Sequence, residues 1–209
     1  MKIIDCEQRT EQWEAIKRGV PSASEFGDIV TPAKGLYSTS ACKYIGRLID
    51  DIVRPGVRRK FGGNAHTERG NELEPEARAP YEFERDTSVR EVGFVLTDCG
   101  RFGCSPDAMT EDHEGIGGAE IKSPDGPTHV SWILEGGLPN DHKAQVHGNI
   151  IVTGSAWWDF LSYCPGYERI LVRVYPDQFT DQLRSHLERF HNEYKAALAK
   201  FGLTHPSEV

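Results

Sequence analysis

Apolar positions in the first 85 residues recur at the three- and four-residue spacing of amphipathic helices. This spacing predicts helices over residues 9–19, 38–53 and 66–85, and Pro55 ends the second of them. The segment Ser22–Glu25 carries serines followed by an acid, which is typical of a helix N-cap, so another helix is expected to begin there. The N-terminal part of the chain is therefore expected to be mainly helical.

From residue 89 onward the pattern changes to short apolar runs separated by turn residues such as glycine and aspartate. Strands are predicted over residues 89–96, 101–108, 118–122, 156–164 and 169–175, and helices over residues 138–154 and 176–201. Asn140 or Asp141 can cap the first of these helices, and Gly154 can end it. This order predicts an α/β fold of mixed α+β type, with helices flanking a central mixed sheet. Because no repeat or clear linker interrupts the chain, residues 1–209 are expected to form one domain.

The composition suits a soluble protein, with 38% hydrophobic residues and no apolar run approaching the roughly 20 residues that span a bilayer. The N-terminal residues are charged where a signal peptide would be apolar, so we expect a cytoplasmic protein. Five cysteines without a C-x-x-C pair predict free thiols, mostly buried, in a reducing compartment.

The net charge of −8 argues against non-specific binding to nucleic acid over the whole surface. A local exception follows the second predicted helix, where basic residues gather in a loop containing proline and glycine. This loop is either an ordinary solvated segment or an arm that contacts phosphates on an otherwise acidic body. Its basic residues are Arg54, Arg58, Arg59 and Lys60.

The clearest candidate chemistry lies in the stretch GAEIKSP, residues 118–124. On a strand, Glu120 and Lys122 project from one face while Ile121 turns into the core. Twelve residues lie between Asp107 and Glu120, enough for a turn that brings two strands side by side. Converging carboxylates repel each other unless a cation lies between them, and oxygen-only ligands favour Mg²⁺ or Mn²⁺. Alone, the three residues are compatible either with such a site or with a solvated charge pair.

Other motifs surround this triple and occur in one characteristic order. Any one of them is a weak signal, whereas the five together are a strong one. The motifs are WEAIKRGVPSAS (13–24), GNELEPEAR (70–78), GCSPD (103–107), EIKSP (120–124) and AQV (144–146).

This order resembles the PD-(D/E)xK nuclease core, and in particular the lambda-exonuclease-like alkaline exonucleases of phage recombination systems. The resemblance implies a restriction-endonuclease-like fold and the hydrolysis of phosphodiesters with Mg²⁺, or Mn²⁺, as cofactor. The resemblance implies that Asp107, Glu120 and the backbone carbonyl of Ile121 bind the metal. It implies that Lys122 orients the attacking water and that Gln145 contacts the scissile phosphate. Glu74 is implied to support the metal's water shell or the nucleophile.

The resemblance also implies a pocket for a terminal 5′-phosphate, formed here by Ser24, Ser105 and a cation. The family's arginine is replaced by Lys17, with Arg18 beside it, and lysine binds phosphate as a point charge. Ser22 is a lesser candidate, because it can equally belong to the helix cap.

Proteins of this family digest one strand of duplex DNA from its 5′ end and leave a 3′ single strand. The resemblance therefore implies 5′-phosphorylated double-stranded DNA ends as substrate, a homotrimer encircling the duplex and a single-strand annealing protein as partner. It also implies a phage or prophage origin in a bacterial host cell. Three alternatives stay open: an endonuclease of the same core, a Cas4-like nuclease, and a catalytically silent DNA-binding protein. The cysteine pattern argues against the Cas4-like nuclease, because no cysteine follows Cys164 to complete an iron–sulfur site.

Overall fold

A four-stranded mixed sheet forms the centre of the molecule. The computed structural model describes residues 1–56 and 65–208, with the side chains of residues 57–72 outside the description. The strand order is β4–β5–β6–β7, in which only the neighbours β5 and β6 are parallel. This confirms the predicted mixed sheet. The strands are β4 (Ala108–Asp112), β5 (Gly115–Lys122), β6 (Trp158–Ser162) and β7 (Ile170–Val174).

A second, smaller sheet was not predicted. It is antiparallel and consists of β1 (Lys2–Ile4), β2 (Phe94–Leu96) and β3 (Gly103–Cys104) in that order. The single strand predicted over residues 101–108 is wrong, because β3 belongs to this sheet and β4 to the central one. Pro106 lies between them and has no N–H to donate to a ladder, which accounts for the interruption.

Most of the predicted helices are present, with three differences. The helix expected after Ser22 is instead a 3₁₀ helix, and the Ser22 side chain makes no capping hydrogen bond. The helix α4 was missed, and α5 is preceded by Pro139 rather than capped by Asn140 or Asp141. The helices are α1 (Glu11–Lys17), η1 (Ala23–Asp28), α2 (Ala41–Val53), α3 (Ala65–Arg85), α4 (Gly126–Glu135), α5 (Asn140–Thr153), α6 (Gln178–Ala199) and η3 (Pro206–Glu208).

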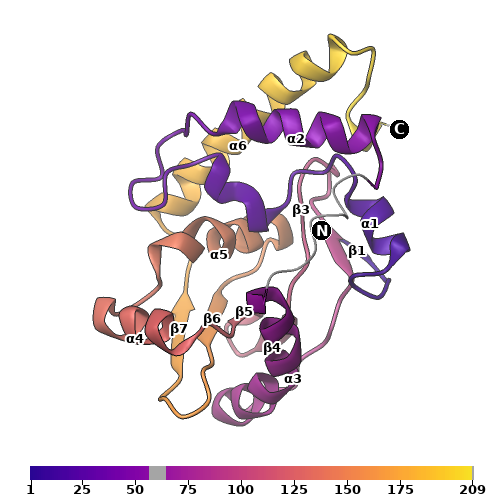
Figure 1. Cartoon of the computed structure of the whole chain (residues 1–209). Coiled ribbons are helices and arrows are strands. Elements are labelled where there is room, and N and C mark those ends of the chain that lie inside the picture. Colours follow the sequence, from indigo (N-terminus) through magenta and orange to yellow (C-terminus); the bar gives the residue numbers. More distant parts are fainter. Residues whose placement is uncertain (57–64, 209) are drawn as a thin grey trace.

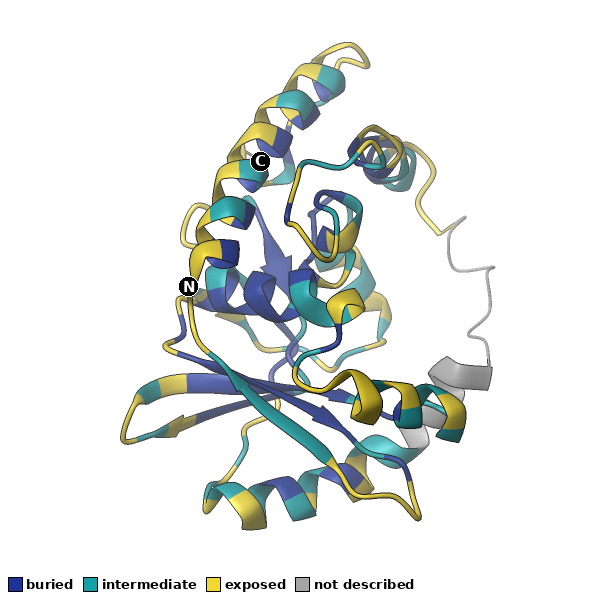
Figure 2. Cartoon of the chain, turned by 90° about the vertical axis from the view of Figure 1, so that its left-hand side faces the viewer, coloured by how far each residue is buried: buried dark blue, intermediate teal, exposed yellow. Residues whose placement is uncertain are grey.

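The helices cover the central sheet on both faces, as Figures 1 and 2 show. On one face α5 packs between the sheet, η1 and α6, and the main hydrophobic core lies there. On the other face α3 packs against β5, where Ala77 and Tyr81 of α3 join a smaller core with Ile121 and Leu161. No helix of the described residues is long and apolar enough to cross a membrane.

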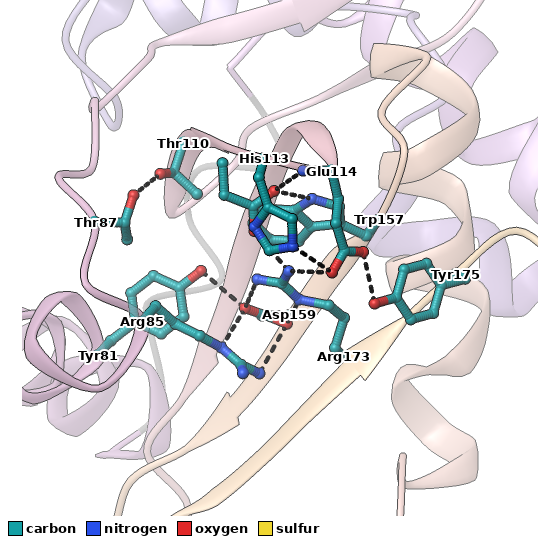
Figure 3. Close-up of polar contacts among 11 residues, drawn as sticks. Tyr81, Arg85, Thr87, Thr110, His113, Glu114, Trp157, Asp159, Arg173 and Tyr175 are labelled. Carbon is teal, nitrogen blue, oxygen red and sulfur yellow. Dashed lines mark hydrogen bonds and ion pairs between the residues drawn. The ribbon is translucent and has the colours of Figure 1, made fainter.

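A buried ion cluster holds the C-terminal half of α3 onto the sheet (Figure 3). The Asp159 carboxylate on β6 is fully buried and accepts hydrogen bonds from Tyr81 Oη at 3.1 Å and Arg85 Nε at 2.8 Å. Arg173 of β7 donates to the same carboxylate at 3.0 Å, and its guanidinium lies 3.6 Å from the Trp157 ring centroid. Two cations therefore compensate this acid, and the helix that carries Glu74 is fixed to the sheet through it.

The five cysteines are free thiols, as predicted. The expectation that most are buried is wrong: Cys104 and Cys164 are buried, while Cys42 and Cys99 are exposed.

Candidate active site

The β4–β5 hairpin brings Asp107 next to Glu120. Ala108 pairs with Ala119 in the antiparallel register, so the residue before Ala108 lies level with Glu120. The Ile121 N–H donates to Asp107 Oδ2 at 2.7 Å. Because the N–H and C=O of one strand residue point to the same edge, the Ile121 carbonyl also faces the Asp107 side. The predicted pairing of the two strands is confirmed, and it places two carboxylates and a backbone carbonyl close together.

The Glu120 carboxylate is only 1% exposed, and three hydrogen-bond donors contact it. Lys122 Nζ forms an ion pair with Glu120 Oε1, as expected for side chains two positions apart on one strand face. Gln145 Nε2 donates to the same oxygen at 2.5 Å, and Asn149 Nδ2 donates to Oε2 at 3.0 Å. Ile121 is buried on the opposite face, in agreement with the alternation predicted for this strand.

Both amides come from α5, which lies over this end of the sheet. Gln145 and Asn149 are four residues apart and therefore share one face of the helix. Gln145 was predicted from the sequence as a site residue, whereas Asn149 was not. The signal that would have found Asn149 is a second amide one turn after the first on a mostly buried helix, since a buried amide requires a polar partner.

Glu74 reaches the site from α3 and is held by two arginines. Arg78 Nη2, one helical turn away, contacts Glu74 Oε1 at 2.6 Å, and Arg9 Nη2 contacts Oε2 at 3.2 Å. Glu74, both arginines and Asp107 line one cavity of about 510 Å³. The structure thus brings Glu74 into the same recess as Asp107, while neither arginine had been given a role from the sequence.

The electrostatics of the cluster show an excess of negative charge. Burial and the neighbouring Glu120 raise the pKa of Asp107 to about 8, although Lys122 opposes this rise. Burial disfavours the ammonium of Lys122, but Glu120 and Asp107 together raise its pKa. Glu74 adds a further negative charge that raises the pKa of Asp107. Glu74 itself is paired with Arg9 and Arg78, so the acids that share the single lysine are Asp107 and Glu120.

This donor set fits a hard divalent cation. The carboxylates of Asp107 and Glu120 and the carbonyl of Ile121 offer oxygen atoms only, the ligand type preferred by Mg²⁺ and Mn²⁺. Within the described residues, no group of three His, Cys, Asp or Glu side chains is arranged to hold an ion on its own. The carbonyl, together with water or phosphate oxygens, would complete the coordination, as is usual for Mg²⁺.

The residues predicted to hold a 5′-phosphate are brought together only in part. Trp13 of α1 joins two of them: its Nε1 donates to Ser105 Oγ at 2.9 Å, and Lys17 Nζ lies 3.6 Å from its ring centroid. Ser24 is exposed, and its hydroxyl lies 3.4 Å from that of Ser22. Lys17 and Ser105 therefore both contact the Trp13 side chain.

Two further links concern Ser22 and Arg18. The 3₁₀ helix containing Ser24 follows a bridge between Ser22 and Gly103, two residues before Ser105. This bridge brings the serine segment alongside β3. Arg18 is half-buried at the C-cap of α1, where its backbone N–H donates to Ala15.

The predicted DNA-contacting arm is described only at its start. Arg54 directly follows α2 and forms a hydrogen bond from Nε to Asp50 Oδ1 at 2.6 Å. Its side chain is 60% exposed. Arg58, Arg59 and Lys60 lie outside the described residues.

Comparison with known proteins supports a nuclease fold. The family described as the YqaJ-like viral recombinase domain matches residues 12–156. The chain is similar to the alkaline exonuclease LHK-Exo of Laribacter hongkongensis, with 30% identity, coverage of 92% of this chain and 96% of that one, and a TM-score of 0.78. The LHK-Exo complex with dAMP gives 29% identity, the same coverage and a TM-score of 0.79.

A phage-related exonuclease of Haemophilus somnus 129PT shares the fold at 12% identity, with a TM-score of 0.66 and coverage of 90% of this chain and 99% of that one. Comparison with curated proteins finds no similar sequence. The fold predicted from the sequence, the PD-(D/E)xK core with helices around a mixed sheet, is confirmed.

Proposed function

Because the chain belongs to the YqaJ-like viral recombinase family, we propose that it is a Mg²⁺-dependent 5′→3′ exonuclease acting on linear double-stranded DNA. Membership of this family and the alkaline-exonuclease neighbours support a nuclease of this type. The observation that carries the finer proposal is the pairing of Asp107 with Glu120 beside Lys122. Burial and the adjacent Glu120 raise the pKa of Asp107, and such a pair of carboxylates is expected where a cation binds, since the cation removes their repulsion.

In the proposed reaction, Asp107, Glu120 and the Ile121 carbonyl hold the ion. When bound, Mg²⁺ polarises the phosphodiester and lowers the pKa of a bound water. The Lys122 ammonium orients that water and stabilises negative charge on the reacting phosphate. The Lys122 side chain is 29% exposed and its ammonium pairs with the buried Glu120. Lys122 is therefore the group proposed to contact both the attacking water and the reacting phosphate.

Glu74 and Gln145 support these groups from two helices on opposite faces of the sheet. Arg9 and Arg78 hold the Glu74 carboxylate at the cavity wall, where it accepts hydrogen bonds from water in the shell of the ion. Gln145 orients Glu120 by its hydrogen bond to Oε1 and faces the scissile phosphate from α5. The proposed catalytic site thus lies on the β4–β5 strand pair and is supported by α3 and α5.

The polarity of digestion is assigned to a pocket for the 5′ end. Lys17 and Ser105 both contact Trp13, and we include Arg18 and Ser24 in the proposed pocket. A terminal phosphate has more negative charge than an internal one, so a cation beside hydroxyl donors favours a 5′-phosphorylated end. Digestion from that end leaves a 3′ single-stranded overhang.

The cellular role follows from this product. A 3′ overhang is the substrate of single-strand annealing in phage-type homologous recombination, so an annealing protein is the proposed partner. We further propose that the protein forms a homotrimer around the duplex and acts in the cytoplasm of a bacterial host. In this assembly, phosphates of the duplex are contacted by Arg54, Arg58, Arg59 and Lys60. Such contacts depend on salt and are largely indifferent to base sequence.

The test uses a linear duplex carrying either a 5′-phosphate or a 5′-hydroxyl, incubated with the protein and Mg²⁺. We expect the 5′-phosphorylated strand to shorten from its 5′ end and the reaction to stop when EDTA removes the ion. A closed circular duplex is the matched control and is expected to stay intact. Cutting of the circle would favour an endonuclease, equal loss from both 3′ ends would overturn the polarity, and no cleavage of any DNA would indicate a silent binding protein.

A further inference from the structure

Arg9 lines the same cavity as the acids of the candidate active site, but it is bonded there less completely than Arg78. Its Nη2 donates to Glu74 Oε2 at 3.2 Å, and among the described residues its guanidinium makes no other hydrogen bond. Arg78 pairs with both Glu74 and Glu91 through its two terminal nitrogens. The Arg9 side chain is 54% exposed, whereas that of Arg78 is 18% exposed. Arg9 therefore keeps N–H donors that are accessible to a ligand.

The backbone at Arg9 is held in an uncommon conformation between two anchored neighbours. Its φ of 67° lies in the left-handed region, which residues other than glycine rarely adopt. On one side, Gln8 Nε2 donates to the carbonyls of Val92 at 2.9 Å and Pro106 at 3.0 Å. On the other side, Thr10 caps α1 with its side chain. Such a conformation persists only where the surroundings fix it, and it is concentrated at functional sites.

The charge of the cavity indicates the kind of ligand that Arg9 can bind. Five acids and two arginines line the cavity, and one of the acids is Asp107. A DNA strand brings further negative charge, so its phosphates need cations along the path into the site. Arg78 is occupied by two carboxylates, which leaves Arg9 as the exposed cation of the cavity wall within the described part of the chain. A guanidinium also presents paired N–H groups that match two oxygens of a phosphate.

We propose that Arg9 is a substrate-binding residue whose guanidinium contacts a backbone phosphate of the DNA strand entering the Asp107–Glu120 site. The hydrogen bond to Glu74 orients the side chain before DNA binds, and the remaining donors make the phosphate contact. The inference rests on the proposed function, because it takes DNA as the ligand. The contact is additional to those proposed for the 5′-phosphate pocket.

A purely structural role for Arg9 makes a different prediction. In that role Arg9 would only neutralise and orient Glu74, and its loss would affect DNA binding only through that carboxylate. A phosphate contact releases counterions from the DNA, so its loss makes the DNA affinity less dependent on salt. The salt dependence, measured with and without the Glu74 charge, therefore separates the two roles.

The experiment titrates a fluorescent 5′-phosphorylated duplex with the protein at several salt concentrations, in EDTA to withhold the ion needed for cleavage. Arg9→Gln removes the charge, and Arg9→Asn removes it with a residue that tolerates the left-handed backbone. Both substitutions are repeated in a Glu74→Gln background. Arg189→Gln is the matched control, because Arg189 of α6 is 58% exposed and pairs with Glu193. Thermal unfolding shows whether each variant is folded before it is titrated.

In both Arg9 variants we expect the dissociation constant of the duplex to rise by at least about fivefold at low salt. The slope of log affinity against log salt concentration should become shallower by about 0.7–0.9, with no change in the control. Both effects should remain in the Glu74→Gln background.

An unchanged slope in folded Arg9 variants, or an effect that disappears in the Glu74→Gln background, would overturn the inference while leaving the proposed nuclease activity intact. Failure of the wild-type protein to bind the duplex would overturn the substrate of the proposed function, and this inference with it.

Discussion

Two buried carboxylates lie on opposite faces of neighbouring strands, and they differ in how their charge is compensated. Glu120 of β5 faces α5, and Asp159 of β6 faces α3 with Ala119 as its strand neighbour. Asp159 meets two guanidinium groups and a tyrosine hydroxyl. Glu120 meets one ammonium and two neutral amides, and has Asp107 as a second acid beside it.

The difference distinguishes an acid that stabilises the fold from one that we propose binds the metal ion. Around Asp159 two arginines compensate the carboxylate, and Arg173 also pairs with Asp112 at 2.6 Å, so no cation is lacking. Around Glu120 one lysine faces both Glu120 and Asp107, and burial together with the Glu120 charge raises the pKa of Asp107. Structural ion pairs also perturb pKa values, but the combination of incomplete compensation and an adjoining cavity is typical of a functional site.

The largest effect is expected at Lys122. Lys122→Ala should reduce the rate of DNA cleavage by about 10²–10³-fold or more, because it removes the donor that stabilises charge in the transition state. Duplex binding, measured by fluorescence anisotropy without cleavage, should change little. The control is Lys195→Ala, which breaks an exposed pair with Glu208 on the far side of the core and should leave the rate unchanged. Full activity of Lys122→Ala would show that Lys122 has no part in the chemistry.

Asp159 should show the opposite behaviour. Asp159→Asn leaves the half-buried guanidinium groups of Arg85 and Arg173 without this buried counter-charge, and we expect the free energy of unfolding to fall by about 3–5 kcal/mol. At a temperature where the variant is folded, its Mg²⁺ affinity should equal that of wild type. Glu120→Gln is the paired variant: it should lose Mg²⁺ affinity with a much smaller change in stability. Equal losses of Mg²⁺ affinity in Asp159→Asn and Glu120→Gln would show that the two acids do not differ in metal binding.

The pH dependence of stability gives a smaller effect. The folded protein raises the pKa of Asp107 to about 8 from its ordinary value of 3.8, so the folded state binds more protons between these values. The stability that this carboxyl confers is present at low pH and is lost as the pH rises through about 8. Asp107→Asn should remove this dependence and be more stable than wild type at pH 8 in EDTA.

Thermal unfolding of wild type and Asp107→Asn from pH 5 to pH 9 checks this sign. Added Mg²⁺ should stabilise wild type at pH 8 and leave the variant almost unaffected, because bound ions favour the ionised carboxyl. Parallel stability curves for the two proteins would contradict the raised pKa.

The smallest effect is expected at Tyr81. Tyr81→Phe removes one hydrogen bond to Asp159 while the two arginines remain, so stability should fall by about 1 kcal/mol without any change in Mg²⁺ affinity. Tyr167→Phe, at a half-exposed position, is the matched control and should change stability by less than about 0.5 kcal/mol. Chemical denaturation of both variants measures the difference. A weakened Mg²⁺ affinity in Tyr81→Phe would show that the two clusters are coupled across the sheet.

Local sequence patterns were sufficient for the part of the site that lies on one hairpin. Asp107, Glu120 and Lys122 are close in the chain, and strand alternation alone places Glu120 and Lys122 on one face. The helix α4 was missed although Asp125 caps it, with its carboxylate accepting from the Thr128 N–H at 3.0 Å. An Asp–Gly–Pro start is a recognisable N-cap followed by proline in the first turn, and this signal was available.

Contacts between distant segments were beyond local patterns. Arg9 and Glu74 are 65 positions apart, and the ring around Asp159 joins residues that are 74 and 78 positions away. Each of these side chains has many possible partners in the sequence, and only the packing of helices on the sheet selects one. The same holds for Trp13, which contacts Lys17 and also donates a hydrogen bond to Ser105, 92 positions away from it.

By itself, the sequence determined the family motifs, the mixed sheet and the residues of the hairpin that carry the acids, because these depend on short-range periodicity and on the order of motifs. Only the tertiary structure decided which acid is compensated and which is not. Charge balance at a buried carboxylate depends on the groups that surround it in three dimensions, and at Glu120 and Asp159 those groups come from different helices on opposite faces of one sheet.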